Sequence, residues 1–220
     1  MNASSDQLST PKRLVVMDID STLIDEEVID LLGDASGHGE QIASITERAM
    51  RGEIDFKAAL RERVALLEGL PVSVFDDVIA RTHYTNGALD LINECHRRGW
   101  TVGVVSGGFH EVADTLVNRA GIDHCLANNL VVKDGHLTGV IDGDTVTKES
   151  KLAALRDWAA LDGVDMRDTV AIGDGANDIP MILAAGIGIA FCAKPVVREA
   201  APHSITRRDL RLALPIIDAA

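Results

Sequence analysis

Short apolar runs alternate along the chain with segments whose apolar residues recur at helical spacing. Four apolar runs have the length and the polar ends of buried strands: 14–17, 100–105, 169–172 and 187–191. Apolar residues at intervals of three and four predict helices between them, over about 88–98, 109–120, 149–161 and 178–185. This alternation predicts an α/β fold with a doubly wound, mostly parallel, Rossmann-like sheet.

Two segments interrupt the alternation. The sequence LVVKDGHLTGV, within residues 126–140, predicts a β-hairpin with Asp134-Gly135 at its turn. From Glu26 to about Ala80 the spacing is helical and no strand pattern occurs, so a small helical domain is expected directly after the first strand. We therefore predict three parts: a core formed by 12–24 and 84–220, a helical cap at 25–83, and a disordered tail at 1–11.

Composition limits the classes of partner. The chain has 220 residues and a formal net charge of −13, which disfavours nucleic acid and anionic membranes as partners. Aromatic residues make up only 3%, which leaves few surfaces on which bases could stack. A small-molecule substrate remains compatible with this charge, because local cations can dominate one pocket.

Targeting signals and cysteine frameworks are not visible in the sequence. Residues 1–10 lack a basic and then apolar signal pattern, and the longest uncharged run, 179–193, is too short to span a bilayer. Cys95, Cys125 and Cys192 match neither a zinc nor a disulfide pattern and are expected to be reduced, buried thiols. We expect a cytoplasmic protein, either a monomer or a homodimer.

Two carboxylates follow the first strand. Asp18 and Asp20 lie two residues apart where LVVM ends, and ligands of α/β sheets bind beyond the carboxyl ends of strands. Two acids on one side of an extended chain repel unless a cation or a shared proton relieves them. A simple turn rich in Asp and Ser explains this stretch about equally well.

Two further strand ends carry polar residues. Ser106-Gly107-Gly108 precedes a helix and could let the backbone approach an anion, although a plain tight turn is the commoner meaning of such a tripeptide. The sequence GDGAND contributes Asp174 and Asp178 at a helix start. Together with Asp18 and Asp20 this makes four carboxylates in one neighbourhood, and oxygen ligands of this kind favour Mg²⁺.

Lys151 begins the helix before the GDGAND strand. A lysine in the first turn opposes the helix dipole and is ordinarily a solvated surface residue. A phosphate site beside several acids needs a fixed cation, which makes this lysine a candidate for the site.

In their order along the chain, DIDST, SGG, Lys151 and GDGAND resemble the motifs of the haloacid dehalogenase-like phosphohydrolases. The resemblance spans about 14–212 and is greatest to the members that act on O-phospho-L-serine, whose hairpin, FCAKP segment and inserted helices are also similar. It implies an Mg²⁺-dependent phosphatase with a Rossmann-like core and a helical cap.

The resemblance also implies roles for the core residues. Asp18 would be the nucleophile that forms an aspartyl-phosphate, and Asp20 the general acid and then base. Ser106, Gly107 and Lys151 would hold the phosphoryl group. The metal would be bound by Asp18, the Asp20 carbonyl, Asp174 and Asp178. Asn177 would contact the substrate or its phosphate.

In the cap, the resemblance implies that Glu27 binds the α-ammonium and Arg63 the α-carboxylate of the substrate, with Met50 and Phe56 as an apolar wall. Taken alone, Glu27 could simply complement a helix dipole and Arg63 could be a surface residue.

The expected reaction is hydrolysis of O-phospho-L-serine to L-serine and phosphate, the last step of serine biosynthesis. Three alternatives stay open: hydrolysis of another small phosphomonoester such as phosphohomoserine or a sugar phosphate, phosphoryl transfer to an acceptor other than water, and a catalytically silent metal or phosphate binder.

Overall fold

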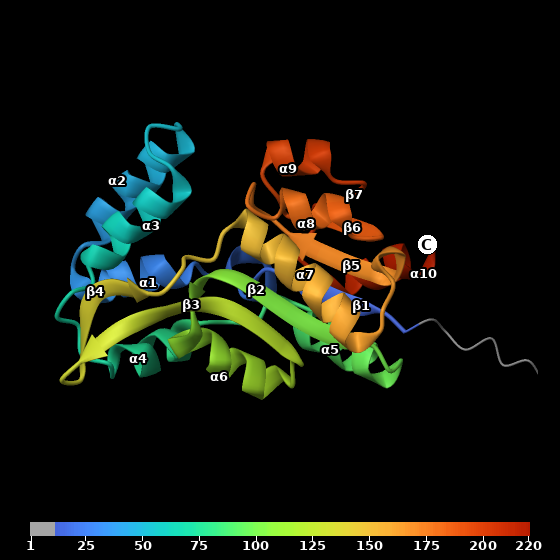
Figure 1. Ribbon diagram of the computed structural model, residues 1–220, viewed down its shortest axis with the longest axis horizontal. Helices are drawn as coiled ribbons and strands as arrows, with labels where there is room; N and C mark the ends of the chain where they lie inside the picture. Colours follow the sequence, from blue (N-terminus) through green and yellow to red (C-terminus); the bar gives the residue numbers. More distant parts are fainter. Residues whose placement is uncertain (1–11) are drawn as a thin grey trace, which may run out of the picture.

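A seven-stranded sheet with helices on both faces forms the centre of the computed structural model, which describes residues 12–220 (Figure 1). The predicted tail at 1–11 lies outside the described residues, as does the side chain of Met50. The strand order is β4-β3-β2-β1-β5-β6-β7, and only the β3–β4 pair is antiparallel. The strands are β1 (Leu14–Met17), β2 (Thr101–Phe109), β3 (His124–Lys133), β4 (His136–Asp142), β5 (Thr169–Gly173), β6 (Ile187–Phe191) and β7 (His203–Ile205). The predicted mostly parallel, doubly wound sheet is confirmed.

Strand β1 lies at the centre because all four of its side chains are apolar and completely buried. It pairs in parallel with β2 on one side and β5 on the other. Val15 and Met17 face one hydrophobic cluster, and Leu14 and Val16 face the other, as alternation along a strand requires. A strand buried on both faces needs a continuous apolar run, which is what LVVM supplies.

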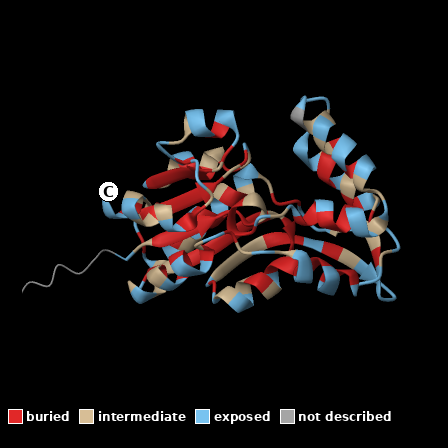
Figure 2. Ribbon diagram, turned by 180° about the vertical axis from the view of Figure 1, so that it is seen from behind, coloured by how far each residue is buried: buried red, intermediate tan, exposed pale blue. Residues whose placement is uncertain are grey.

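Helices cover both faces of the sheet, and Figure 2 shows the buried strands enclosed by half-exposed helices. Side chains of α5, α6 and α10 join the cluster that contains Val15, and those of α7, α8 and α9 join the cluster that contains Leu14. These helices are α5 (Ala88–Arg97), α6 (His110–Ala120), α7 (Lys148–Asp162), α8 (Ile179–Ala184), α9 (Pro195–Ala200) and α10 (Ala213–Asp218), with short 3-10 turns at Met166–Asp168 and Leu210–Leu212. No helix in residues 12–220 is long and apolar enough to cross a membrane.

Four helices occupy the segment between β1 and α5: α1 (Val28–Ser36), α2 (Gly39–Met50), α3 (Phe56–Ala65) and α4 (Val74–Arg81). Figure 1 shows α2 standing away from the sheet, whereas α3 contacts β4 at one end and α4 lies beside α6. The chain enters and leaves this segment side by side, because Asp25 N donates to His83 O and Thr85 N donates to Leu23 O. The segment between α3 and α4 also bonds to the hairpin, through Gly69 N to Leu137 O and Leu137 N to Leu70 O. The boundaries of 25–83 as a separate cap domain stay a prediction.

The structure departs from the predicted elements in two places. Strand β2 continues to Phe109, so Ser106-Gly107-Gly108 lies within the assigned strand rather than after it. Its register against β3 shifts between Val105 and Phe109, which lets these three residues leave the regular ladder. Beyond residue 193, α9, β7 and α10 were not predicted, because segments of three to six residues carry too little periodicity.

Candidate active site

The predicted polar motifs meet at one edge of the sheet. Strands β2, β1 and β5 are adjacent and parallel, so their carboxyl ends lie side by side. Asp18 follows β1, Ser106 lies near the end of β2, and Asp174 follows β5. Sheet order therefore brings together residues that are up to 156 positions apart in the chain, since the group runs from 18 to 174.

An ion-pair network links two of these strand ends. Lys151 Nζ lies 2.6 Å from Asp18 Oδ2 and donates to Asp178 Oδ1 at 2.8 Å. The lysine is 1% exposed and Asp178 is completely buried, so bulk water does not screen the attraction between their charges. Although burial alone would lower the pKa of Lys151, Asp178 and Asp18 raise it overall, and the lysine stays cationic.

Lys151 reaches the site because of how α7 begins. Thr147 caps the helix in a reciprocal capping box with Ser150, and Lys151 is the fourth helical residue. It lies on the helix face that packs on the sheet, next to buried Ala154 and Leu155. The alternative of a solvated surface lysine is therefore wrong.

The turn after Asp18 holds the second carboxylate. Residues 19–23 form one wide turn, with Ser21 in the left-handed region at φ 55°. Asp20 Oδ1 accepts the Val28 N–H at 2.8 Å, and Oδ2 accepts the Ser106 hydroxyl at 2.8 Å. Burial raises the pKa of Asp20, and these two donors only partly oppose that effect. Asp20 thus joins the ends of β1 and β2 to the start of α1.

Glycines are required where the loops approach the acids closely. A Cβ at Gly173 would lie 2.5 Å from the Asp178 carboxyl group, and a Cβ at Gly108 would lie 3.0 Å from both Asp20 Oδ2 and Ser106 Oγ. The glycines of the SGG and GDGAND motifs therefore let the backbone come within contact distance of the carboxylates.

Asp18, Asp174 and Asp178 form a cluster that fits a divalent cation. One carboxylate oxygen from each lies within 4.8 Å of the others, and oxygen donors suit a hard metal ion. Burial and the neighbouring Asp178 raise the pKa of both Asp18 and Asp174, even though Lys151 opposes this. With Asp20 there are four carboxylates against the ammonium groups of Lys151 and Lys194, so the protein's own residues leave negative charge that a divalent cation would balance.

A cavity of about 880 Å³ opens above these acids, between the sheet edge and the inserted helices. Eight of the predicted site residues line it: Asp18, Asp20, Glu27, Phe56, Arg63, Gly107, Asp174 and Asn177. Ser106, Lys151 and Asp178 lie beneath its floor and are tied to it by the bonds described above. Of Met50, only its position at the end of α2 is described. The structure thus gathers the predicted core residues and three of the four predicted cap residues around one cavity.

Several charged residues of the inserted segment line this cavity, and two of them, Glu27 and Arg63, are the predicted substrate contacts. Glu27 Oε1 accepts the Ser21 hydroxyl at 2.7 Å. Loss of hydration inside the cavity, together with the carboxylates of Asp20 and Asp174, raises the pKa of Glu27 to about 7. Arg63 is half-buried and bonds only to neutral oxygens, Ala59 O at 3.3 Å and Thr46 Oγ1 at 3.5 Å, and pairs with no acid in residues 12–220.

Comparison with known proteins decides the family. The sequence profile described as haloacid dehalogenase-like hydrolase matches residues 15–183, which is most of the chain. The chain belongs to the haloacid dehalogenase-like hydrolases. The family inferred from the four motifs is therefore confirmed, and the motif residues of this hydrolase are those that converge below its cavity.

Several similar proteins of nearly the same length are described as phosphoserine phosphatases. The phosphoserine phosphatase of Streptococcus thermophilus is 58% identical over 96% of this chain and 98% of its own length. A solved structure described as a phospho-aspartyl intermediate analogue of phosphoserine phosphatase has a TM-score of 0.88 and 43% identity, and covers 94% of this chain and 99% of its own. A substrate-bound phosphoserine phosphatase complex also has a TM-score of 0.88, at 42% identity, and covers 94% of this chain and 98% of its own.

Sequence reasoning missed two polar residues of this hydrolase's site. Buried Thr22 donates its hydroxyl to Asp174 Oδ1 at 3.2 Å and so links the ends of β1 and β5. Buried Asn128 of β3 bonds to the carbonyl groups of Gly107 and Gly108. Thr22 belongs to the DIDST motif and could have been found there, whereas nothing in the sequence around Asn128 marks it.

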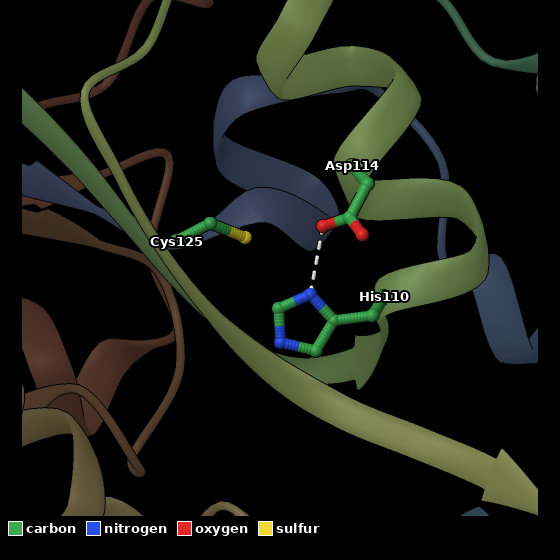
Figure 3. Close-up of side chains that lie close together, drawn as sticks. All are labelled: His110, Asp114 and Cys125. Atoms are coloured by element: carbon green, nitrogen blue, oxygen red, sulfur yellow. Dashed lines mark hydrogen bonds and ion pairs between the residues drawn. The ribbon is translucent and has the colours of Figure 1, made fainter.

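A second cluster of possible metal ligands lies on α6 and β3, outside the cavity. His110 and Asp114 of α6 lie near Cys125, and His110 Nδ1 bonds to Asp114 Oδ1 at 2.7 Å (Figure 3). However, His110 Nε2 accepts the Ala127 N–H at 3.1 Å, so Nδ1 must carry the proton and has no lone pair for a metal. Burial also raises the pKa of Cys125 to about 12, which keeps it a thiol. This cluster is therefore a structural one. The prediction of buried thiols is correct for Cys95, whereas Cys125 and Cys192 are only partly buried.

Proposed function

We propose that this hydrolase converts O-phospho-L-serine and water to L-serine and phosphate through an aspartyl-phosphate on Asp18. The observation that carries the proposal is the cavity itself, with Asp18 at its floor and paired to Lys151 beneath it, and with Arg63, which makes no ion pair in residues 12–220, on its wall. Relatives up to 58% identical over nearly their whole length are named phosphoserine phosphatases, which supports this choice of substrate.

In the first step, an oxygen of Asp18 attacks phosphorus, and the bond from phosphorus to the serine oxygen breaks. A carboxylate needs no base to activate it, and Lys151 at 2.6 Å both orients it and offsets negative charge on the phosphoryl group. The Gly107 N–H would hold a phosphoryl oxygen at the end of β2, and Ser106 would do so by turning its hydroxyl hydrogen from Asp20 to the phosphoryl group.

Asp20 would move the protons. As an acid it protonates the departing serine oxygen, and as a carboxylate it then takes a proton from the water that attacks phosphorus and releases Asp18. A group in this role needs a pKa above that of an ordinary aspartate, and burial raises the pKa of Asp20 in that direction.

Mg²⁺ would be held by Asp18, Asp174 and the Asp20 carbonyl, with Asp178 fixed beside them by Lys151 and the Gly175 N–H. When bound, the ion would screen the negative charge of the carboxylates and the phosphoryl group. Asn177 lines the cavity next to this cluster and would contact substrate or phosphate.

The inserted helices would select the substrate. A guanidinium group binds a carboxylate through two parallel hydrogen bonds, so Arg63 suits the α-carboxylate of phosphoserine. Glu27 suits its α-ammonium group. Phe56 is 39% exposed and approaches Gly107, so it can cover the bound substrate, with Met50 proposed beside it. These helices would then act as a cap over the core.

Removal of divalent cations is the first test. We expect excess EDTA to reduce phosphate release from phosphoserine on the order of 10²-fold or more, because the acid cluster then repels the dianionic phosphate. Added Mg²⁺ in excess of the chelator should restore the rate. Undiminished turnover in EDTA by protein shown to be metal-free would rule out the proposed cation.

The pKa of Glu27 predicts a pH dependence of substrate binding. Because its pKa is raised to about 7, Glu27 is a carboxylate above pH 7 and becomes neutral as the pH falls below it. The KM for phosphoserine should therefore rise as pH falls from 8 to 5, approaching roughly tenfold per pH unit at the acid end. The Glu27→Gln variant controls for titration of the substrate phosphate, and its KM should lack the part of the rise that Glu27 causes. Identical profiles for the two proteins would refute the ammonium contact.

Two alternatives use the same core. Phosphohomoserine or a sugar phosphate could replace phosphoserine, and an alcohol could replace water; a substrate panel and added homoserine distinguish these cases. With phosphoserine as substrate, the enzyme would complete serine biosynthesis in the cytoplasm, a compartment compatible with the three free cysteines Cys95, Cys125 and Cys192.

A further inference from the structure

Residues 106–108 of β2, called the phosphate-binding segment below, lie in an irregular part of the sheet. Val105 pairs with Leu126 and Phe109 pairs with Asn128, so β2 advances by four residues while β3 advances by two. Ser106, Gly107 and Gly108 therefore bulge out of the ladder, and their backbone groups lose regular partners on β3. Buried carbonyl groups left in this way must be bonded by something else.

The side chain of Asn128 supplies those bonds. Its Nδ2 donates to Gly107 O at 2.9 Å and to Gly108 O at 3.2 Å. Asn128 is 2% exposed. On the other side of the Gly107–Gly108 peptide, the Ser106 hydroxyl accepts the Gly108 N–H at 2.7 Å. The peptide planes of the phosphate-binding segment are therefore fixed from both directions.

The same side chain also bonds to the start of α7. Asn128 Oδ1 accepts the Val146 N–H at 2.8 Å. Val146 is buried and immediately precedes Thr147, the residue that caps α7, and Lys151 lies one turn further along. One buried amide with all its polar atoms bonded thus joins the phosphate-binding segment to the helix that carries the catalytic lysine.

We propose that Asn128 is a positioning residue for the phosphoryl site, holding the Gly107–Gly108 peptides and the start of α7 at a fixed separation. Only an amide offers two donors and one acceptor in one plane at this size. The proposal rests on the proposed function only in requiring that the cavity bind a phosphoryl group, whatever the rest of the substrate is.

The Asn128→Asp variant tests this role with a nearly unchanged shape. Its carboxylate still accepts the Val146 N–H but faces two carbonyl oxygens with no hydrogen to donate. We expect kcat/KM to fall on the order of 10²-fold, on both phosphoserine and p-nitrophenyl phosphate. The inhibition constant of inorganic phosphate should rise as well, since the segment that holds it is displaced. The neighbouring Asn129→Asp is the matched control, because Asn129 is exposed, and it should behave like the unmodified protein.

A second variant separates positioning from folding. Asn128→Ala removes the bonds without adding a charge, and its thermal unfolding midpoint should be measured beside its kinetics, well below that midpoint. Positioning predicts weakened phosphate inhibition and reduced kcat/KM in the fully folded variant. A lower unfolding midpoint together with unchanged phosphate inhibition and unchanged kcat/KM would overturn the proposal. Because p-nitrophenyl phosphate and phosphate do not depend on the cap contacts, this outcome is distinct from an absence of phosphoserine turnover by the unmodified enzyme.

Discussion

Replacing Asp18 with asparagine is expected to reduce the kcat for phosphate release by at least roughly 10⁴-fold. The amide is far less nucleophilic than the carboxylate, so no aspartyl-phosphate can form at an appreciable rate. It also removes the negative charge that pairs with Lys151 at 2.6 Å. Phosphate release in a single-turnover assay, followed with phosphoserine, measures the loss.

Folding must be controlled in this experiment, because Asp18 is 6% exposed and its partner Lys151 is buried. Near-ultraviolet circular dichroism and the unfolding midpoint of Asp18→Asn report whether the site is intact. Asp25→Asn is a matched control, since it makes the same change a few residues away, at an exposed position outside the cavity. Turnover by folded Asp18→Asn within tenfold of the unmodified enzyme would contradict the covalent mechanism.

Replacing Arg63 with alanine is expected to raise the KM for phosphoserine and to lower kcat/KM by roughly 10²–10³-fold. The guanidinium faces the cavity without an acid partner in residues 12–220, so a substrate carboxylate can pair with it without breaking an existing ion pair. The kcat/KM for p-nitrophenyl phosphate should stay within a few-fold, since that ester has no α-carboxylate. The ratio of the two losses is the quantity to measure.

Arg61 provides the comparison for this prediction. It lies on the same helix, α3, lines the same cavity, is exposed, and makes no ion pair within the described part of the chain. Arg61→Ala removes the same charge, so an effect of overall potential would appear in both variants and on both substrates. We expect Arg61→Ala to change the two substrates equally and by only a few-fold. Equal losses on both substrates in Arg63→Ala would mean that Arg63 does not contact the α-carboxylate.

The sequence could predict the centre of the fold because the physics there is local. LVVM is an uninterrupted apolar run, and burial on both faces of a sheet requires such a run. The convergence of Asp18 and Asp174 followed from one rule, that parallel strands end at the same edge. The ends of the predicted helices 88–98 and 109–120 were marked by Gly99 and Gly121, which adopt positive φ.

Features that depend on tertiary packing were not predictable in this way. Lys151 resembles a surface lysine until α7 is placed on the sheet, where burial beside two aspartates makes it part of the site. The bulge in β2 depends on its register against β3, so the role of Asn128 is invisible in either strand alone. The proposed roles of Glu27 and Arg63 came only from the family resemblance, because their own spacing permits ordinary surface roles.

The most direct test of the covalent mechanism is to find where phosphorus is bound during turnover. The enzyme is mixed with ³²P-labelled phosphoserine and quenched in acid within the first turnover, and the labelled peptide is then identified by mass spectrometry. The covalent mechanism predicts an acyl phosphate, labile to hydroxylamine, on Asp18, and no such label in Asp18→Asn. Label on another residue, or phosphate release in the first turnover with no protein-bound label at any quench time, would contradict it.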